Sequence, residues 1–311
     1  MIYDHAQLAN DTISGWGVMI VDILLVALAV VGVGYTAMAL RLAAARAQLR
    51  PSLEAIGLGA VTNFFDTLGI GSFAPTTAWL KFRSLVPDRL IPATLNAGHC
   101  IPTIVQALGF IRLVQVDAWL LAACILAAMA GSLVGTAAML RTPVRLVQGI
   151  VGIALIIAAL LYAMQNLNLM PNAGNAVTLI PLFFGLAVVG HFVLGSLMAY
   201  GIGLYAPSLV MLSLMGLDPK AAFPIMMGAC AFLMPVTGQR FMRDERLDLR
   251  IVLGLALGGA PAVLLAAYTV TSLPIVALRW GVVVVALYAA VLLLRAALRP
   301  VPGAPETPVT V

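Results

Sequence analysis

Two short segments of this chain combine the residue types from which proteins build anion sites out of backbone. In Gly69-Ile-Gly-Ser-Phe-Ala-Pro75 and in Gly201-Ile-Gly-Leu-Tyr-Ala-Pro207, two residues separate a Gly-Ile-Gly run from an Ala-Pro pair. Glycine lets the backbone leave helical geometry, and proline suits the first turn of a helix because it has no N–H to leave unbonded. Each segment therefore predicts a helix that stops and another that begins, and such helix starts attract anions. The alternative is that these residues only allow close helix packing.

Polar residues near the two segments extend the predicted site. Ser72, Thr76, Thr77 and Ser208 carry the nearest hydroxyls. Asn96 and His99 follow with helical spacing, so their side chains can line one cavity. The corresponding helix of the second segment brings Gly228 and Gln239. The predicted substrate-binding residues are Gly69, Gly71, Ser72, Thr76, Thr77, Asn96, His99, Gly201, Gly203, Ser208, Gly228 and Gln239.

Asp66 and His99 are the candidates for carrying a proton. Asp66 lies three residues before Gly69 and is the deepest acid of the chain. An ionised carboxylate at mid-membrane costs about 2.5–3.5 kcal/mol on insertion scales, so such residues are usually functional. The alternative for Asp66 is a solvated helix cap nearer the outer surface. A lone histidine in a membrane helix is more often a hydrogen-bonding residue between helices, and we interpret His191 in this way.

The elements that must position these residues are membrane helices. Of the 311 residues, 62% are hydrophobic and 9% are charged, and the apolar stretches reach the roughly 20 residues that a helix needs to cross a bilayer. No long alternation of apolar and polar residues indicates a barrel. The sequence therefore predicts an all-α, polytopic helical membrane protein. The predicted segments are 18–41, 53–69, 73–86, 89–112, 117–140, 144–165, 177–200, 204–216, 220–241, 250–272 and 275–298.

The basic residues predict the orientation. If the N-terminus is periplasmic, the cytoplasmic loops hold fourteen of the seventeen Lys and Arg residues, all except Arg112, Lys220 and Arg279. This positive-inside bias favours a periplasmic N-terminus and a cytoplasmic C-terminus. The net charge of +5 thus reflects topology, and we expect no nucleic-acid partner. Cys100, Cys124 and Cys230 fall inside predicted spans, where we expect small buried hydrophobic residues.

The two glycine segments belong to an internal repeat. Continuing their alignment without a gap also matches Pro87 with Pro219 and Pro92 with Pro224. The predicted orientation puts the two copies in opposite directions, so we expect two inverted repeats of about five segments each, with short or broken helices, plus one extra N-terminal helix. The predicted divisions are an N-terminal helix and loop at 1–50, the first repeat at 51–165, a linker at 166–176, the second repeat at 177–299 and a disordered tail at 300–311.

These features resemble the sulfite exporter TauE/SafE family, also called the toluene sulfonate uptake permease family. The resemblance rests on the duplicated Gly-x-Gly and Ala-Pro element, the Asn- and Gly-containing helix that follows, and the Val116-Asp117 and Leu247-Asp248 pairs that start the next helix. It covers roughly Leu53 to Arg295. The resemblance implies a transporter of the bacterial inner membrane for sulfite, organosulfonates such as sulfoacetate, or related sulfur anions, driven by the proton gradient.

We therefore expect a proton-coupled secondary transporter for a small anion that works by alternating access. The alternative is a passive anion channel, because paired helix ends also suit a selectivity filter. An enzyme is not expected: Ser72 with His99 is the only tempting nucleophile and base, and no known serine-peptidase motif surrounds Ser72. We expect no metal site and no cofactor. The expected partners are the anion, protons and lipid, and a homodimer is left open.

Overall fold

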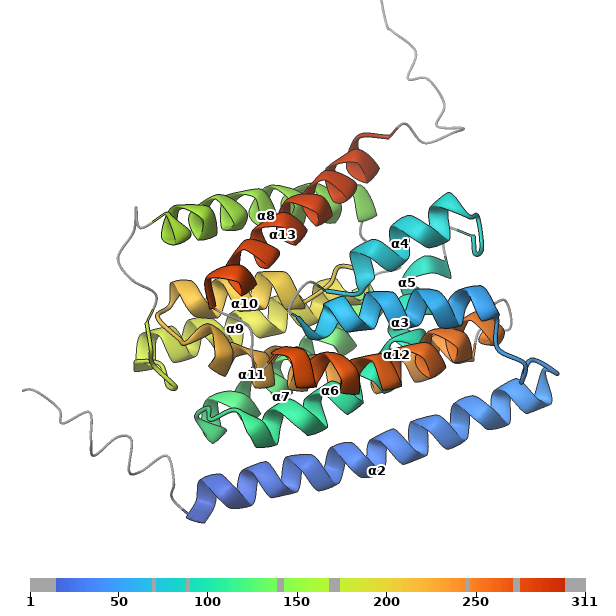
Figure 1. Ribbon diagram of the computed structural model, residues 1–311, viewed down its shortest axis with the longest axis horizontal. Coiled ribbons are helices and arrows are strands. Elements are labelled where there is room, and N and C mark those ends of the chain that lie inside the picture. The colour runs from blue at the N-terminus through green and yellow to red at the C-terminus, as the bar shows by residue number, and fades with distance from the viewer. Residues whose placement is uncertain are drawn as a thin grey trace, which may run out of the picture.

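The protein is built from helices. The computed structural model describes residues 15–68, 71–87, 90–138, 143–167, 174–243, 247–270 and 275–299. In these residues there is no strand, only one isolated bridge between Ala176 and Leu217. The predicted all-α class is confirmed. The helices, shown in Figure 1, are α2 (Gly15–Ala45), α3 (Leu53–Thr67), α4 (Phe73–Phe82), α5 (Ile91–Gly98), α6 (Cys100–Leu113), α7 (Ala118–Ala138), α8 (Val144–Asn166), α9 (Pro181–Met198), α10 (Tyr205–Leu214), α11 (Pro219–Met242), α12 (Leu249–Val270) and α13 (Ile275–Leu298).

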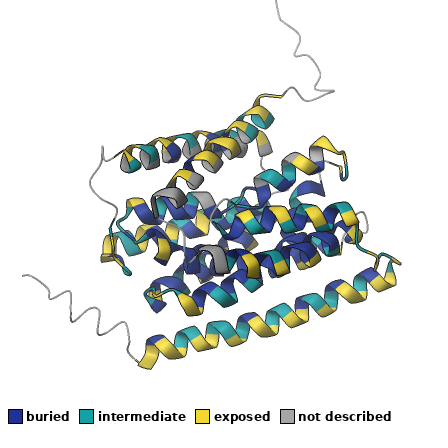
Figure 2. Cartoon of the chain, viewed as in Figure 1, coloured by how far each residue is buried: buried dark blue, intermediate teal, exposed yellow. Residues whose placement is uncertain are grey.

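The helices have the dimensions and surface of a polytopic membrane protein. Five of the described helices, namely α2, α7, α9, α11 and α12, are long and apolar enough to cross a bilayer. The outward faces of α2, α7, α9 and α12 carry exposed apolar side chains, such as Val33 of α2, which is 73% exposed. Figure 2 shows this exposed surface along α2 and the buried residues inside the bundle. Every residue of α11 from Ala221 to Pro235 is buried, so α11 is the central helix.

The predicted span at 89–112 is two helices. α5 ends at Gly98 and α6 begins at Cys100, with His99 at the junction. Pro102 lies four residues after Gly98 and has no N–H to donate to its carbonyl, which explains an interruption here. The expectation that His99 lies in the middle of one helix is therefore wrong.

α4 and α10 are too short to cross the membrane alone. Each has ten residues, which at 1.5 Å per residue is about 15 Å, or half of a hydrocarbon core of about 30 Å. Each begins inside one of the glycine segments, two residues before its proline, as the sequence predicts.

The helix pairings follow the proposed repeat. α3 packs along α12, and α9 packs along α7, which are the corresponding pairs if α9–α13 repeats α3–α8. Corresponding helices α8 and α13 pack on each other, as do α6 and α11. The helices α7 and α12 also begin alike: Asp117 accepts from the N–H of Leu120, and Asp248 from that of Arg250. These pairings support two inverted repeats, which we retain as part of the proposal below.

Glycines let the corresponding helix pairs approach to backbone contact. A Cβ on Gly258 of α12 would meet the Ile56 carbonyl oxygen of α3 at 1.9 Å, and one on Gly131 of α7 would meet the Phe192 carbonyl oxygen of α9 at 1.9 Å. Small residues serve this purpose in membrane helices, where packing replaces the hydrophobic effect as the force between helices. Gly258 and Gly131 therefore serve close packing of these helix pairs.

Gly258→Val is expected to destabilise the bundle. Its side chain would collide with the backbone of α3, and overpacking of this kind costs typically about 1–3 kcal/mol. Gly57→Val is the matched control, because a Cβ on Gly57 meets nothing within 4 Å. Thermal unfolding of the purified variants in detergent measures the difference, and equal midpoints for the two variants would contradict the assigned contact.

Candidate functional site

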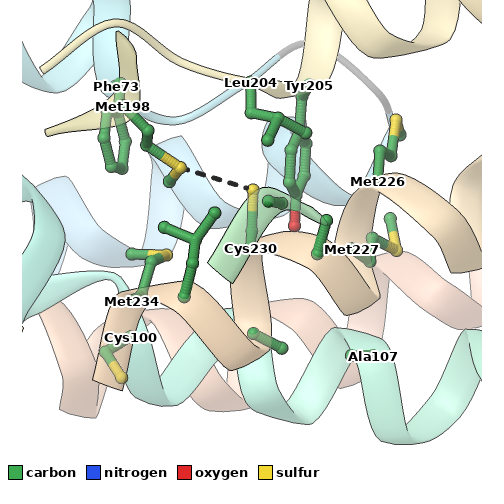
Figure 3. Packing of buried hydrophobic residues seen from close by; sticks show 14 of the residues in the cluster. Phe73, Cys100, Ala107, Met198, Leu204, Tyr205, Met226, Met227, Cys230 and Met234 are labelled. Carbon is green, nitrogen blue, oxygen red and sulfur yellow. Dashed lines mark hydrogen bonds between the residues drawn. The ribbon is translucent and has the colours of Figure 1, made fainter. Parts of the chain in front are cut away.

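A small cavity lies where the two glycine segments meet. Gly71, Ser72 and Phe73 line it from the first segment, and Gly203, Leu204 and Tyr205 from the second. Its volume is about 20 Å³, room for about one water molecule. Figure 3 shows Phe73, Leu204 and Tyr205 above the side chains of α11. The remaining lining residues are Asp66, Thr103, Met198, Cys230 and Met234.

Both segments use glycine where the backbone turns sharply. Gly71 has a φ of 80° and Gly201 a φ of 81°, a region that side chains other than glycine's rarely adopt. Gly69, the repeat equivalent of Gly201, lies outside the described residues. Gly203 lacks a positive φ, and a Cβ there would meet only Phe73, at 3.6 Å. In the second segment, Gly201 therefore makes the turn and Gly203 lines the cavity.

Asp66 is a buried carboxylate on the cavity wall. It is 2% exposed, so the solvated-cap alternative is wrong. One carboxylate oxygen accepts the backbone N–H of Ser72, at the start of α4. The other accepts from Gln106 Nε2 at 2.8 Å. In the part of the chain that the structure describes, no basic side chain is bonded to it. The carboxylate of Asp66 therefore takes the place that a bound anion would have at the start of α4.

The bonds of Gln106 fix the direction of a polar network. Its Nε2 donates to Asp66 and, at 2.9 Å, to Thr67 Oγ1, while its Oε1 accepts the hydroxyl of Tyr205 at 2.5 Å. Thr67 Oγ1 itself donates to the Asn63 carbonyl, so it must accept from Gln106. The donors thus run from Tyr205 through Gln106 to Asp66. Sequence reasoning did not select Tyr205 or Gln106 as site residues, although a glutamine inside an apolar span is a usable signal.

The second helix start has no carboxylate. No side chain caps α10. Among the described residues, the backbone N–H groups of Gly203, Leu204 and Tyr205 have no acceptor. Three unbonded amides at a helix N-terminus beside a small cavity attract anionic oxygens strongly.

Two buried histidines hold the short helices in place. His99 bonds Asn63 Oδ1 through Nδ1 and Thr76 Oγ1 through Nε2, both at 3.0 Å. His191 bonds the Ala187 carbonyl through Nδ1 at 2.8 Å and Ser208 Oγ through Nε2 at 2.9 Å. Since a carbonyl oxygen and an amide oxygen can only accept, both Nδ1 atoms carry hydrogen and both Nε2 atoms accept from a hydroxyl. Neutral imidazoles satisfy all these bonds.

Thr76 and Ser208 occupy equivalent positions of the sequence repeat, so each short helix uses the same hydroxyl position to bond a histidine. Neither hydroxyl lines the cavity. This arrangement favours a positioning role for His99 and leaves Asp66 as the better candidate proton carrier.

The other predicted residues lie around the cavity rather than in it. Asn96 Nδ2 donates to the Met198 carbonyl at 3.2 Å. Thr77 is half-buried and Gln239 is exposed. A Cβ on Gly228 would meet Ile125 at 2.9 Å, so this glycine serves packing. Cys100, Cys124 and Cys230 are buried, as expected.

Comparison of the chain with protein-family models, curated proteins and solved structures gives no match.

Proposed function

We propose that this membrane protein is a secondary transporter that moves a small anion together with a proton. The observation that carries the proposal is the meeting of two interrupted helices, one from each half of the chain, at one small cavity. Interrupted helices at such a position are the usual substrate site of transporters with inverted repeats. The proposed mechanism is alternating access, in which the two repeats rock around this cavity.

The start of α10 is the proposed anion site. Its three unbonded N–H groups supply donors without a fixed positive charge, so the anion can bind and leave. The equivalent start of α4 already holds Asp66. The two halves thus contribute unequal groups to one cavity, an anion receptor from one and a carboxylate from the other.

Proton coupling follows from the closeness of these groups. Two unit charges about 4 Å apart at an effective dielectric constant of about 20 repel each other by about 4 kcal/mol. The anion and an ionised Asp66 therefore disfavour each other by up to about a thousandfold in affinity. Taking up a proton removes the repulsion, so the anion binds with a proton and its affinity rises as the pH falls.

The proposed substrates are sulfur oxyanions or organosulfonates, such as sulfite or sulfoacetate. Beside the amides, the lining residues Phe73, Met198, Leu204 and Met234 are apolar. Such a wall accepts an alkyl group but leaves an oxygen without a hydrogen bond, which is costly in a buried site. The resemblance to the TauE/SafE family and the position in a bacterial inner membrane, with a periplasmic N-terminus, belong to the same proposal.

Methanesulfonate is expected to bind at least about tenfold more tightly than sulfate. The two ligands have similar shapes, but sulfate replaces the methyl group with a fourth oxygen and adds a second charge. A thermal-shift titration of the purified protein at about pH 5 and about pH 8 measures both affinities. We expect stabilisation by methanesulfonate to be stronger at the lower pH. Equal stabilisation by the two ligands would contradict the apolar wall.

Uptake into proteoliposomes tests the transport itself. A transporter gives saturable uptake of labelled methanesulfonate, accumulated against its gradient when the interior is alkaline. A channel gives uptake that never exceeds equilibration at any pH gradient. The second result would reject the proposal in favour of a passive pore.

A further inference from the structure

The hydrogen bond between Tyr205 and Gln106 joins the two halves at the cavity. Tyr205 is the first residue of α10 in the second half, and Gln106 lies on α6 in the first. The histidine bonds differ, because they tie α4 and α10 to helices of their own halves. Tyr205 and Cys230 both line the cavity and lie beside each other in Figure 3. Rocking of the halves must therefore break the Tyr205 bond, whereas it can leave the histidine bonds intact.

We infer that Tyr205 and Gln106 form a latch that holds the two halves together at the cavity while Asp66 is ionised and loosens when Asp66 takes up a proton. In the observed network, both Asp66 oxygens act as acceptors. A proton on the oxygen that faces Gln106 would point at the Nε2 hydrogen, so Gln106 must leave or turn its amide over. Turning the amide over directs Oε1 away from Tyr205, so the Tyr205 hydroxyl loses the acceptor of its 2.5 Å bond and can then only accept from Nε2. Protonation at one residue in this way weakens the bond that joins the repeats at the cavity.

The surroundings of Asp66 leave it as the group that titrates in this network. The titratable side chains that face it are Tyr205 from α10 and Cys230 from α11. α12, which packs along α3, has no ionisable residue between Arg250 and Tyr268, and α4 has only Lys81, near its far end. His99, at the junction of α5 and α6, has both nitrogens bonded to neutral partners.

The accessibility of Cys230 reports the state of the latch. The chain has three cysteines, so Cys100→Ala with Cys124→Ala leaves Cys230 as the only thiol. The rate at which a small charged methanethiosulfonate reagent labels this parent protein is measured at about pH 8 and about pH 5. Because thiols react faster at high pH in any protein, each variant is compared with the parent at the same pH.

Tyr205→Phe removes the latch hydroxyl and keeps the ring. It is expected to be labelled about tenfold faster than the parent at the higher pH, and at nearly the parent rate at the lower pH, where the latch is already open. Asp66→Asn, which imitates the protonated acid, is expected to behave in the same way. Tyr35→Phe is the matched control: it removes another buried phenol bond, to the Ala97 carbonyl, away from the cavity. Its rate is expected to equal that of the parent at both pH values.

A ratio of Tyr205→Phe to parent that is the same at both pH values would overturn the inference, as would no acceleration at all. If Tyr205→Phe does not fold, Asp66→Asn decides alone, because a parent-like rate at the higher pH is incompatible with the latch. The role of the latch in transport rests on the proposed function, but the labelling test is carried out without an anion. Missing uptake with pH-dependent labelling would reject the transport and keep the latch, and intact uptake with pH-independent labelling would reject only the latch.

Discussion

Asp66→Asn is expected to abolish proton-driven accumulation of the anion while strengthening anion binding at high pH. The substitution removes the negative charge from the cavity wall but keeps the size of the side chain. Without the repulsion of up to about 4 kcal/mol between two nearby charges, the variant binds methanesulfonate at about pH 8 as tightly as the native protein does at about pH 5. Because no proton accompanies the anion, a pH gradient no longer drives accumulation.

The gain in binding separates this outcome from simple damage. A misfolded or blocked site loses both binding and transport, whereas the proposal predicts tighter binding together with lost coupling. Asp117→Asn is the matched control, since it makes the same chemical change at a helix cap of α7, where asparagine caps as well as aspartate. Titrations and proteoliposome uptake are measured for both variants. Uptake by Asp66→Asn that still follows the pH gradient would exclude Asp66 as the proton carrier.

Gly203→Val is expected to eliminate anion binding with little loss of stability. A Cβ at Gly203 would meet only Phe73, at an ordinary contact distance of 3.6 Å, so the larger side chain can extend into the cavity. The cavity of about 20 Å³ is then filled. We expect the affinity for methanesulfonate to fall by about a hundredfold or more, because the three amides at the start of α10 are covered.

Gly203 is a better test position than Gly71. Gly71 has a φ of 80°, so a valine there would strain the backbone whatever the space around it. Gly109→Val on α6 is the matched control, since a Cβ there meets nothing within 4 Å. Binding is measured by calorimetry and stability by thermal unfolding. Native-like binding by a folded Gly203→Val protein would show that the anion does not bind at this cavity.

The helices and their interruptions were largely predictable from the sequence, because their causes are local. Apolar length sets a membrane span, and glycine and proline act on the backbone at their own positions. The starts of α4 at Phe73 and of α10 at Tyr205 therefore lie within a residue of the predicted positions. The sequence also identified Asp66, since a carboxylate in an apolar span is conspicuous wherever that span packs. The break at His99 was missed, although Pro102 is a local signal for it.

The partners of these residues were decided only by the tertiary structure. In the sequence, Tyr205 is only an aromatic residue in an apolar helix. The packing of the short helix α10 brings its hydroxyl to Gln106, which in turn bonds Asp66. In the same way, the sequence predicts that the Ser208 hydroxyl lies near the site. The packing of α10 on α9 instead places this hydroxyl in a hydrogen bond with His191. Side-chain hydrogen bonds between helices depend on the rotation and depth at which the helices pack. Those quantities are set by contacts over the whole bundle, which no local pattern of residue types contains.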